Sequence, residues 1–196
     1  MKKLFCFLMI LYVFSEANIF AQTENESFEK QNNLSNSFFA SVYLTDAFPI
    51  GKIAEYNKIS FGHGIKAGYS FSKLPLSTNI IIESSINLPT AKNNIQSWNN
   101  LVVLCGVSYT LPVADFLDIS PELDFGMTNN FISSEGTKNN TFTDLTIQIS
   151  ANLSFCSEKL KTAGFAFNIN PFYRLMLEKS YIGQYAGLQA GIIFKF

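Results

Sequence analysis

The 196-residue chain has few of the residues from which active sites and metal centres are usually built. It contains one histidine and three cysteines, and charged residues make up only 15% of it. No CxxC pair, histidine-rich tract, phosphate-binding loop or GxSxG sequence occurs. The net charge is −1 and no basic patch appears, which excludes an electrostatic case for nucleic-acid binding. We therefore expect no cofactor, no metal site and no nucleic-acid partner.

Long apolar runs are missing too, apart from one at the start of the chain. Lys2 and Lys3 precede an apolar stretch at 4–14, which is too short to span a bilayer. A basic start followed by such a stretch is typical of a secretory signal peptide. Cleavage is expected after Ala17 or Ala21, and we adopt the later site. Its removal leaves residues 22–196, enough for one domain.

The cysteines imply no disulfide framework. Cys6 lies within the leader, too early for lipid attachment. Cys105 and Cys156 remain in the mature chain, and we expect both to be packing residues.

The rest of the chain is apolar in a dispersed way, with 47% hydrophobic residues and 20 phenylalanines overall. A polar stretch at 22–36 is followed by eight segments in which apolar and polar residues alternate. Period-two alternation predicts β-strands with one apolar and one polar face. Pro121 and Pro171 fall within two of these segments, where a proline loses a ladder hydrogen bond or marks a bulge. The segments are 37–46, 59–71, 78–88, 98–111, 117–128, 141–155, 163–175 and 184–196.

The last nine residues, 188–196, alternate in the same way and end on a terminal Phe. This segment resembles the closing strand of bacterial outer-membrane β-barrels, in which the barrel assembly machinery reads the final aromatic residue. The mature chain is similar to the small barrels of the outer membrane protein X, W and A-barrel group. The resemblance implies Phe194 and Phe196 as the assembly signal. Its implied partners are the assembly machinery and outer-membrane lipid, with lipopolysaccharide or its equivalent.

We therefore expect an all-β fold, an eight-stranded antiparallel up-and-down transmembrane barrel at 37–196, integral to the cell outer membrane. It follows a signal peptide at 1–21 and a polar periplasmic lead-in at 22–36. An even number of strands places both termini on the periplasmic side. The connections 72–77, 112–116 and 156–162 are then periplasmic turns. Longer outward loops, open to an extracellular partner, are expected at 47–58, 89–97, 129–140 and 176–183.

Aromatic residues gather near the expected strand ends, as in the two interfacial girdles of a membrane barrel. The expected outer girdle consists of Phe61, Trp98, Phe142, Tyr173 and Tyr185. The expected periplasmic girdle consists of Phe38, Tyr69, Phe71, Tyr109, Phe155, Phe165, Phe194 and Phe196.

Charged residues on the polar face are expected to pair inside the barrel, because eight strands leave an interior only wide enough for side chains. A hairpin around 72–77 pairs Lys66 with Glu83, and one around 156–162 pairs Asp144 with Arg174. A cation site on the acidic residues of 117–128 is not favoured, because they share one strand and lack convergent oxygen ligands. The expected lumenal network is Lys66, Glu83, Asp118, Glu122, Asp124, Asp144 and Arg174.

The expected role is structural, adhesive or surface-interacting. A narrow conduit for small solutes or apolar molecules is the main alternative. A soluble lipocalin-like barrel or β-sandwich would need the apolar face inside. A lipid A-modifying enzyme is a minor alternative: His63 and Ser84 both fall on the outward face. We expect no Asp or Glu on that face to orient the histidine, so we predict no enzymatic activity.

Overall fold

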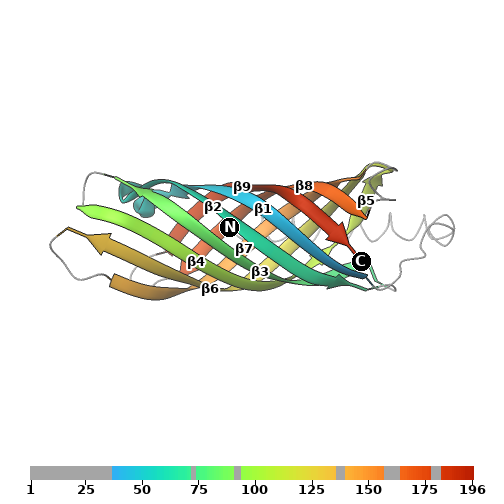
Figure 1. The fold of residues 1–196 in the computed structure, drawn as a ribbon, viewed down its shortest axis with the longest axis horizontal. Helices are drawn as coiled ribbons and strands as arrows, with labels where there is room; N and C mark the ends of the chain where they lie inside the picture. Colours follow the sequence, from blue (N-terminus) through green and yellow to red (C-terminus); the bar gives the residue numbers. More distant parts are fainter. Residues whose placement is uncertain (1–36, 72–73, 91–93, 136–139, 157–163, 178–181) are drawn as a thin grey trace, which may run out of the picture. The chain divides into compact units, whose positions relative to one another are not determined.

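The computed structural model describes residues 37–71, 74–90, 94–135, 140–156, 164–177 and 182–196. The expected signal peptide and lead-in lie outside these residues. The described part is an antiparallel sheet closed on itself, as Figure 1 shows. Within it, no helix is long and apolar enough to cross a membrane.

The sheet runs in the order β4-β3-β2-β1-β9-β8-β7-β6-β5, and an additional β4–β6 pairing closes it. Eight strands of the described chain therefore form the barrel, and short β5 pairs with the start of β6. This confirms the all-β, eight-stranded antiparallel fold. The elements are β1 (Ser37–Ile50), η1 (Gly51–Glu55), β2 (Asn57–Ser70), β3 (Leu76–Pro89), β4 (Ile95–Tyr109), β5 (Leu111–Ala114), β6 (Leu117–Ser134), β7 (Asn140–Phe155), β8 (Phe165–Leu177) and β9 (Ile182–Lys195).

The two ends of the barrel differ in their connections. At one end, here called the turn end, β2 joins β3, β4 joins β6 through β5, and β7 joins β8. Ser37 pairs with Ser70 at this end, and the Phe196 N–H donates to Phe38 O there. At the other, the loop end, β1 joins β2, β3 joins β4, β6 joins β7 and β8 joins β9.

Alternation along each strand divides the side chains into an apolar outer wall and a polar interior. Neighbouring residues illustrate it: Ile65 is 54% exposed and Lys66 is 8% exposed, while Ile80 is 57% exposed and Ser77 and Asn79 are buried. A soluble barrel hides its apolar face, so this inverted pattern is that of a barrel surrounded by lipid. It argues against the lipocalin-like alternative.

The strands reach further toward the loop end than we expected. Residues 47–50, 57–58, 95–97 and 129–134 were predicted as loop but belong to strands. Asn129 pairs with Thr143 in a continued ladder, with both side chains on the outside. Polar residues on both faces hide the period-two signal, and asparagines resemble turn residues. The expected turn at 112–116 likewise contains the short strand β5.

The two strand prolines have different effects. Pro121 pairs with Ala151 within an unbroken β6–β7 register. At Pro171 the β7–β8 ladder is interrupted, since its pairs run to Phe172 and resume at Ile169. The missing N–H of a proline accounts for the gap.

Candidate functional site

An ion pair between Arg174 and Glu83 crosses the inside of the barrel. Arg174 on β8 donates from Nη1 to Glu83 Oε1 at 2.8 Å and from Nη2 to Oε2 at 3.1 Å. These strands are not neighbours in the sheet, so the bond spans the lumen. Gln148 Oε1 accepts from Arg174 Nε at 2.9 Å, while Gln189 Nε2 and Tyr43 Oη donate to Glu83 Oε2. Both charges are thus buried with their hydrogen-bonding capacity largely used.

A second ion pair, between Lys66 on β2 and Glu122 on β6, also crosses the lumen. Asp124 lies two residues after Glu122 on the same inward face and is completely buried. Its Oδ2 accepts a long hydrogen bond of 3.4 Å from Gln148 Nε2. The two bridges therefore tie opposite walls of the barrel together at mid-height.

The predicted Lys66–Glu83 pair is wrong. In the β2–β3 hairpin Lys66 lies opposite Ile81, a shift of two residues from the predicted register. Strand β3 begins at Leu76, directly after Pro75, so the turn is tighter than expected. A two-residue shift keeps every side chain on its predicted face but changes every partner.

The predicted Asp144–Arg174 pair is wrong for the same kind of reason. Strand β8 begins at Phe165, so the β7–β8 connection is longer than predicted and Gln148 lies opposite Arg174. Asp144 Oδ2 instead accepts from Asn130 Nδ2 at 2.8 Å. The carboxylate is buried at the loop end.

The loop end of the lumen is filled by an apolar cluster. Ile53, from η1, is only 1% exposed and folds into the mouth of the barrel. Trp98 donates from Nε1 to Asn130 Oδ1 at 3.0 Å, and Tyr185 Oη accepts from Asn57 Nδ2 at 3.4 Å. The cluster, called the apolar plug below, consists of Ala47, Ile53, Trp98, Phe172, Met176 and Tyr185.

The plug corrects the expected outer girdle. Trp98 and Tyr185 are each 3% exposed and lie inside the barrel, while Phe142 is half-buried on an inward position. Phe61 and Tyr173 do lie on the outer wall. Alternation alone places Trp98 and Tyr185 inward. The girdle prediction was based on their aromatic character and their nearness to a strand end, and it ignored this register.

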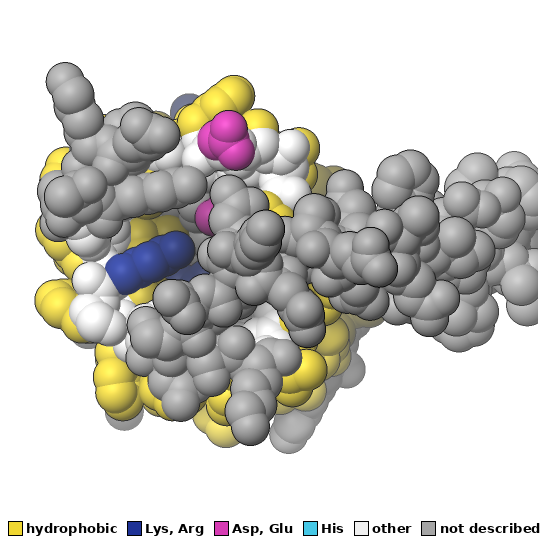
Figure 2. All heavy atoms as spheres, turned by 90° about the vertical axis from the view of Figure 1, so that its right-hand side faces the viewer, with side chains coloured by type: hydrophobic (Ala, Val, Ile, Leu, Met, Phe, Trp, Pro, Cys, Tyr) yellow, Lys and Arg dark blue, Asp and Glu magenta, His cyan; other side chains and the backbone are white. Residues whose placement is uncertain are grey.

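The turn half of the lumen is polar. Figure 2 views the molecule from this end and shows a hollow with a basic side chain inside it. Asp118 lies half-buried near this mouth, opposite Pro112 of β5. Several polar atoms in this half have no protein partner, including Ser41 Oγ, Asn152 Oδ1 and Asn168 Oδ1. Buried polar groups of this kind are usually satisfied by water. The buried polar side chains of this half are Ser41, Ser77, Asn79, Ser108, Ser120, Asn152, Ser154 and Asn168.

On the outer wall, His63 lies directly opposite Ser84 in the β2–β3 ladder, not opposite Ile86 as predicted. The expectation that no acid shares this face is also wrong, because Asp46 occupies an outward position of β1. Asp46 Oδ1, however, accepts the backbone N–H of Leu188 at 3.1 Å. That contact turns the carboxylate toward β9 and away from β2, so it does not orient the histidine.

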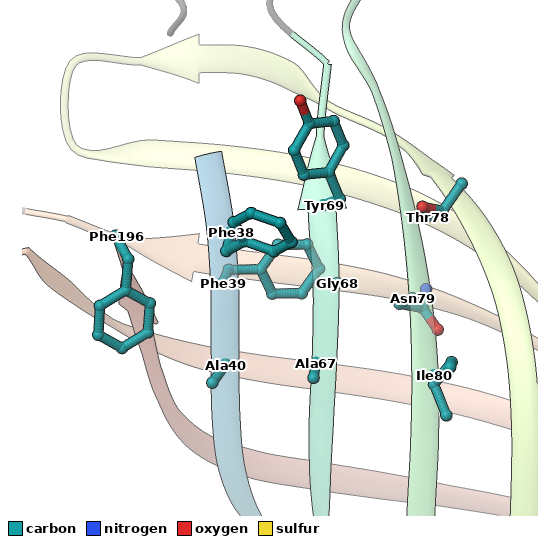
Figure 3. A pocket seen from close by; sticks show the side chains of 10 residues that line it. All are labelled: Phe38, Phe39, Ala40, Ala67, Gly68, Tyr69, Thr78, Asn79, Ile80 and Phe196. Atoms are coloured by element: carbon teal, nitrogen blue, oxygen red, sulfur yellow. The ribbon is translucent and has the colours of Figure 1, made fainter. Parts of the chain in front are cut away.

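A groove of about 490 Å³ lies on the outer wall at the turn end (Figure 3). Ala40 and Ala67 form its floor, since they pair across β1 and β2 and have small side chains. Phe38 and Tyr69 stand at its edge as a T-shaped pair with centroids 5.0 Å apart. Phe196 forms another wall; it is 78% exposed and its N–H donates to Phe38 O.

The remaining candidates are possible metal ligands and the two cysteines. Among the described residues, no three His, Cys, Asp or Glu side chains gather as a metal centre. Cys105 and Cys156 form no disulfide bond with each other, and Cys105 lies exposed on the outer wall.

Comparison with solved structures identifies the same architecture in several bacterial proteins. Neisserial surface protein A (NspA) aligns with a TM-score of 0.58 and 14% identity, over 83% of this chain and all of that one. Ail, the attachment invasion locus protein of Yersinia pestis, aligns with a TM-score of 0.57 and 13% identity, over 83% and 100%. This chain has the fold of the small eight-stranded outer-membrane β-barrels.

The outer membrane protein OprG from Pseudomonas aeruginosa has the same fold, with a TM-score of 0.55 and 8% identity. That alignment covers 83% of this chain and 96% of OprG. No family model and no curated protein sequence matches the chain. The likeness therefore lies in the backbone, and the chain's role has to be inferred from its own side chains.

Proposed function

We propose that the mature chain is an integral protein of the bacterial outer membrane with a structural, adhesive or surface-interaction role. The turn end would face the periplasm and the loop end the exterior. Outer-membrane lipid and lipopolysaccharide, or its equivalent, would surround the apolar wall. The barrel assembly machinery would read Phe194 and Phe196, whose rings are exposed at the turn end.

The observation that carries this proposal is the closure of the lumen. The apolar plug fills the loop end, and the Arg174–Glu83 and Lys66–Glu122 bridges cross the middle. Each buried bridge would have to be broken to admit a solute, leaving charges unpaired in the interior. A barrel closed in this way is suited to presenting its outer surface rather than to transport.

The loop end provides a firm surface for such a role. The connections there are bonded to one another: Thr90 N–H donates to Tyr56 O at 2.9 Å, and Glu135 N–H donates to Asn94 O at 3.0 Å. Exposed segments held on a rigid scaffold are where binding residues are commonly found. Among the solved structures of this fold, Ail is described as an attachment protein and has been solved with the heparin analogue sucrose octasulfate.

The orientation is tested by labelling intact cells with a membrane-impermeant maleimide. In a background of Cys105→Ala and Cys156→Ala, Lys52→Cys in η1 should be labelled and Leu74→Cys, which replaces an exposed residue between β2 and β3, should not. The reverse pattern would show that the loop end faces the periplasm. Adhesion of the same cells to host surfaces, compared with cells lacking the protein, then tests the surface role.

A conduit is the second candidate, favoured by the polar turn half of the lumen. Planar bilayers separate the two. We expect no discrete conductance steps from the purified protein, whereas reproducible steps that disappear when it is omitted would favour the conduit. Enzymatic activity on lipid A is not proposed, because Asp46 binds Leu188 instead of orienting His63.

A further inference from the structure

Asp124 is a buried carboxyl group to which no side-chain cation is bound. It is fully buried in the lumen, while Lys66 is bound to Glu122 and Arg174 to Glu83. Gln148 reaches Asp124 Oδ2 through a long hydrogen bond, and Asp124 Oδ1 has no hydrogen-bond partner. An unpaired carboxylate in a protein interior is unfavourable, so this position calls for either a proton or a cation.

Two further oxygens without partners lie beside it. Glu122 uses Oε2 for Lys66, and its Oε1 is buried without a partner. Asn79 on β3 is 4% exposed, and neither of its amide atoms has a partner of acceptable geometry. Glu122 and Asn79 lie within hydrogen-bonding reach of the Asp124 carboxyl group, and Lys66 lies close enough for its charge to act on it.

Gly106 explains how Asn79 and Asp124 approach each other. The ladder places Gly106 between them, opposite Asn79 on one side and opposite Asp124 on the other. A Cβ on Gly106 would lie 2.0 Å from Asp124 Oδ1, so the carboxylate occupies the space that a side chain would fill. The Asn79 amide thus brings an oxygen from a second strand, β3, beside those of the acidic residues on β6.

We propose that Asp124, Glu122 and Asn79 bind a small monovalent cation, Na⁺ or K⁺, inside the barrel. Lys66 offsets one of the two carboxylates, and the ion would balance the other when Asp124 is ionised. Ca²⁺ or Mg²⁺ would overcompensate that single charge. A proton shared between Asp124 and Glu122 is the competing arrangement, and a comparison of salts distinguishes the two. The polar turn half supplies water and a route for the ion.

This site is independent of the proposed surface role, and its test uses the folded protein in neutral detergent micelles. Thermal unfolding is measured at one pH and one ionic strength in NaCl, KCl and choline chloride. An ion bound only in the folded state raises the melting temperature, and choline is too large for the site. We expect a melting temperature several degrees higher in NaCl or KCl than in choline chloride. Asp124→Asn should lose this difference, and the control Asp118→Asn should keep it.

Equal melting temperatures of the unaltered protein in the three salts would overturn the proposal, as would a difference that persists in Asp124→Asn. Stabilisation by acid with no preference among the salts would assign the charge to a shared proton and also overturn it. Sodium-23 NMR gives a measurement that needs no variant: the unaltered protein should broaden the sodium line, and K⁺ should reverse the broadening more than choline does. Equal effects of the two competitors would count against the site.

Discussion

Arg174 binds Glu83 through both guanidinium Nη atoms across the inside of the barrel, at 2.8 and 3.1 Å. The Arg174 guanidinium also lies 4.9 Å from the centre of the Phe172 ring, which belongs to the apolar plug. The bridge therefore joins the charged middle of the lumen to its closed end.

Replacing one partner of this bridge should lower the free energy of unfolding by more than half of what replacing both partners does. Arg174→Ala or Glu83→Ala alone leaves a buried charge unpaired, a loss of about 3–5 kcal/mol for buried pairs. The double variant should therefore be more stable than the sum of the two single losses predicts. Urea unfolding in micelles or lipid vesicles measures the cycle. Simple additivity would show that the two side chains do not interact in the folded barrel.

The register of β2 and β3 is tested by comparing two cycles that share Lys66. Lys66→Ala combined with Glu122→Ala should show coupling of about 0.5–3 kcal/mol, the range for residues in contact. Lys66→Ala combined with Glu83→Ala should show little, since Glu83 is bound to Arg174. Coupling to Glu83 rather than Glu122 would restore the register that the hairpin sequence first suggested.

Ile53 should control the access of water to the loop end of the lumen. Ile53→Gly removes a buried side chain of the plug, while Lys52→Ala changes an exposed neighbour in the same turn. Trp98 is the single tryptophan of the chain and lies in the plug, so its fluorescence reports the change directly. We expect a red shift and stronger acrylamide quenching in Ile53→Gly, and neither in Lys52→Ala. An unchanged spectrum would mean that the plug closes without Ile53.

Cys105 should face lipid acyl chains. It is exposed on the outer wall of β4, between the apolar residues Val103 and Val107. With Cys156→Ala, a nitroxide label on Cys105 should be relaxed by dissolved oxygen, which enters lipid, more than by a water-soluble nickel chelate. A matched label at Lys52→Cys should show the opposite preference. Stronger relaxation of Cys105 by the chelate would remove that part of the wall from the bilayer.

Assembly should depend on the last residue. Deleting Phe196 removes an exposed ring and a backbone bond to Phe38 at the turn end, whereas deleting Gln22 changes only the polar lead-in. We expect the first deletion to reduce the heat-modifiable form on unboiled SDS gels and in outer-membrane fractions, and the second to leave it unchanged. Equal recovery of both would show that Phe196 is not part of the assembly signal.

The sequence predicted the wall of the barrel better than its interior. Alternation alone places Ile65 outside and Lys66 inside, because the face of a residue depends only on whether its position is odd or even. Partners depend on where each turn begins and ends. Strand β3 begins at Leu76, two residues earlier than predicted, and the β2–β3 register is shifted by two residues. The strand from 117 also continues through Asn129 and Asn130, where polar residues on both faces leave no periodic signal.

Contacts across the lumen are harder to predict from a sequence pattern than the faces of the strands are. Glu83 and Arg174 come from strands that are not neighbours in the sheet, so no hairpin argument pairs them. Ile53 reaches the lumen from a turn of 3-10 helix within a predicted loop, where a single isoleucine carries no periodicity. Gly106 gives room to Asp124 in a way that only the assembled neighbours reveal.

The β1–β9 seam sets the timing of folding. Ala40 near the beginning of the barrel pairs with Phe194 near the end of the chain. Until β9 has been made, β1 keeps an open edge whose backbone groups have no partner, and lipid cannot supply one. Contacts between such distant parts of a chain also form slowly. The circle therefore cannot close before the last strand has been synthesised, and any partial sheet that forms earlier keeps an open edge.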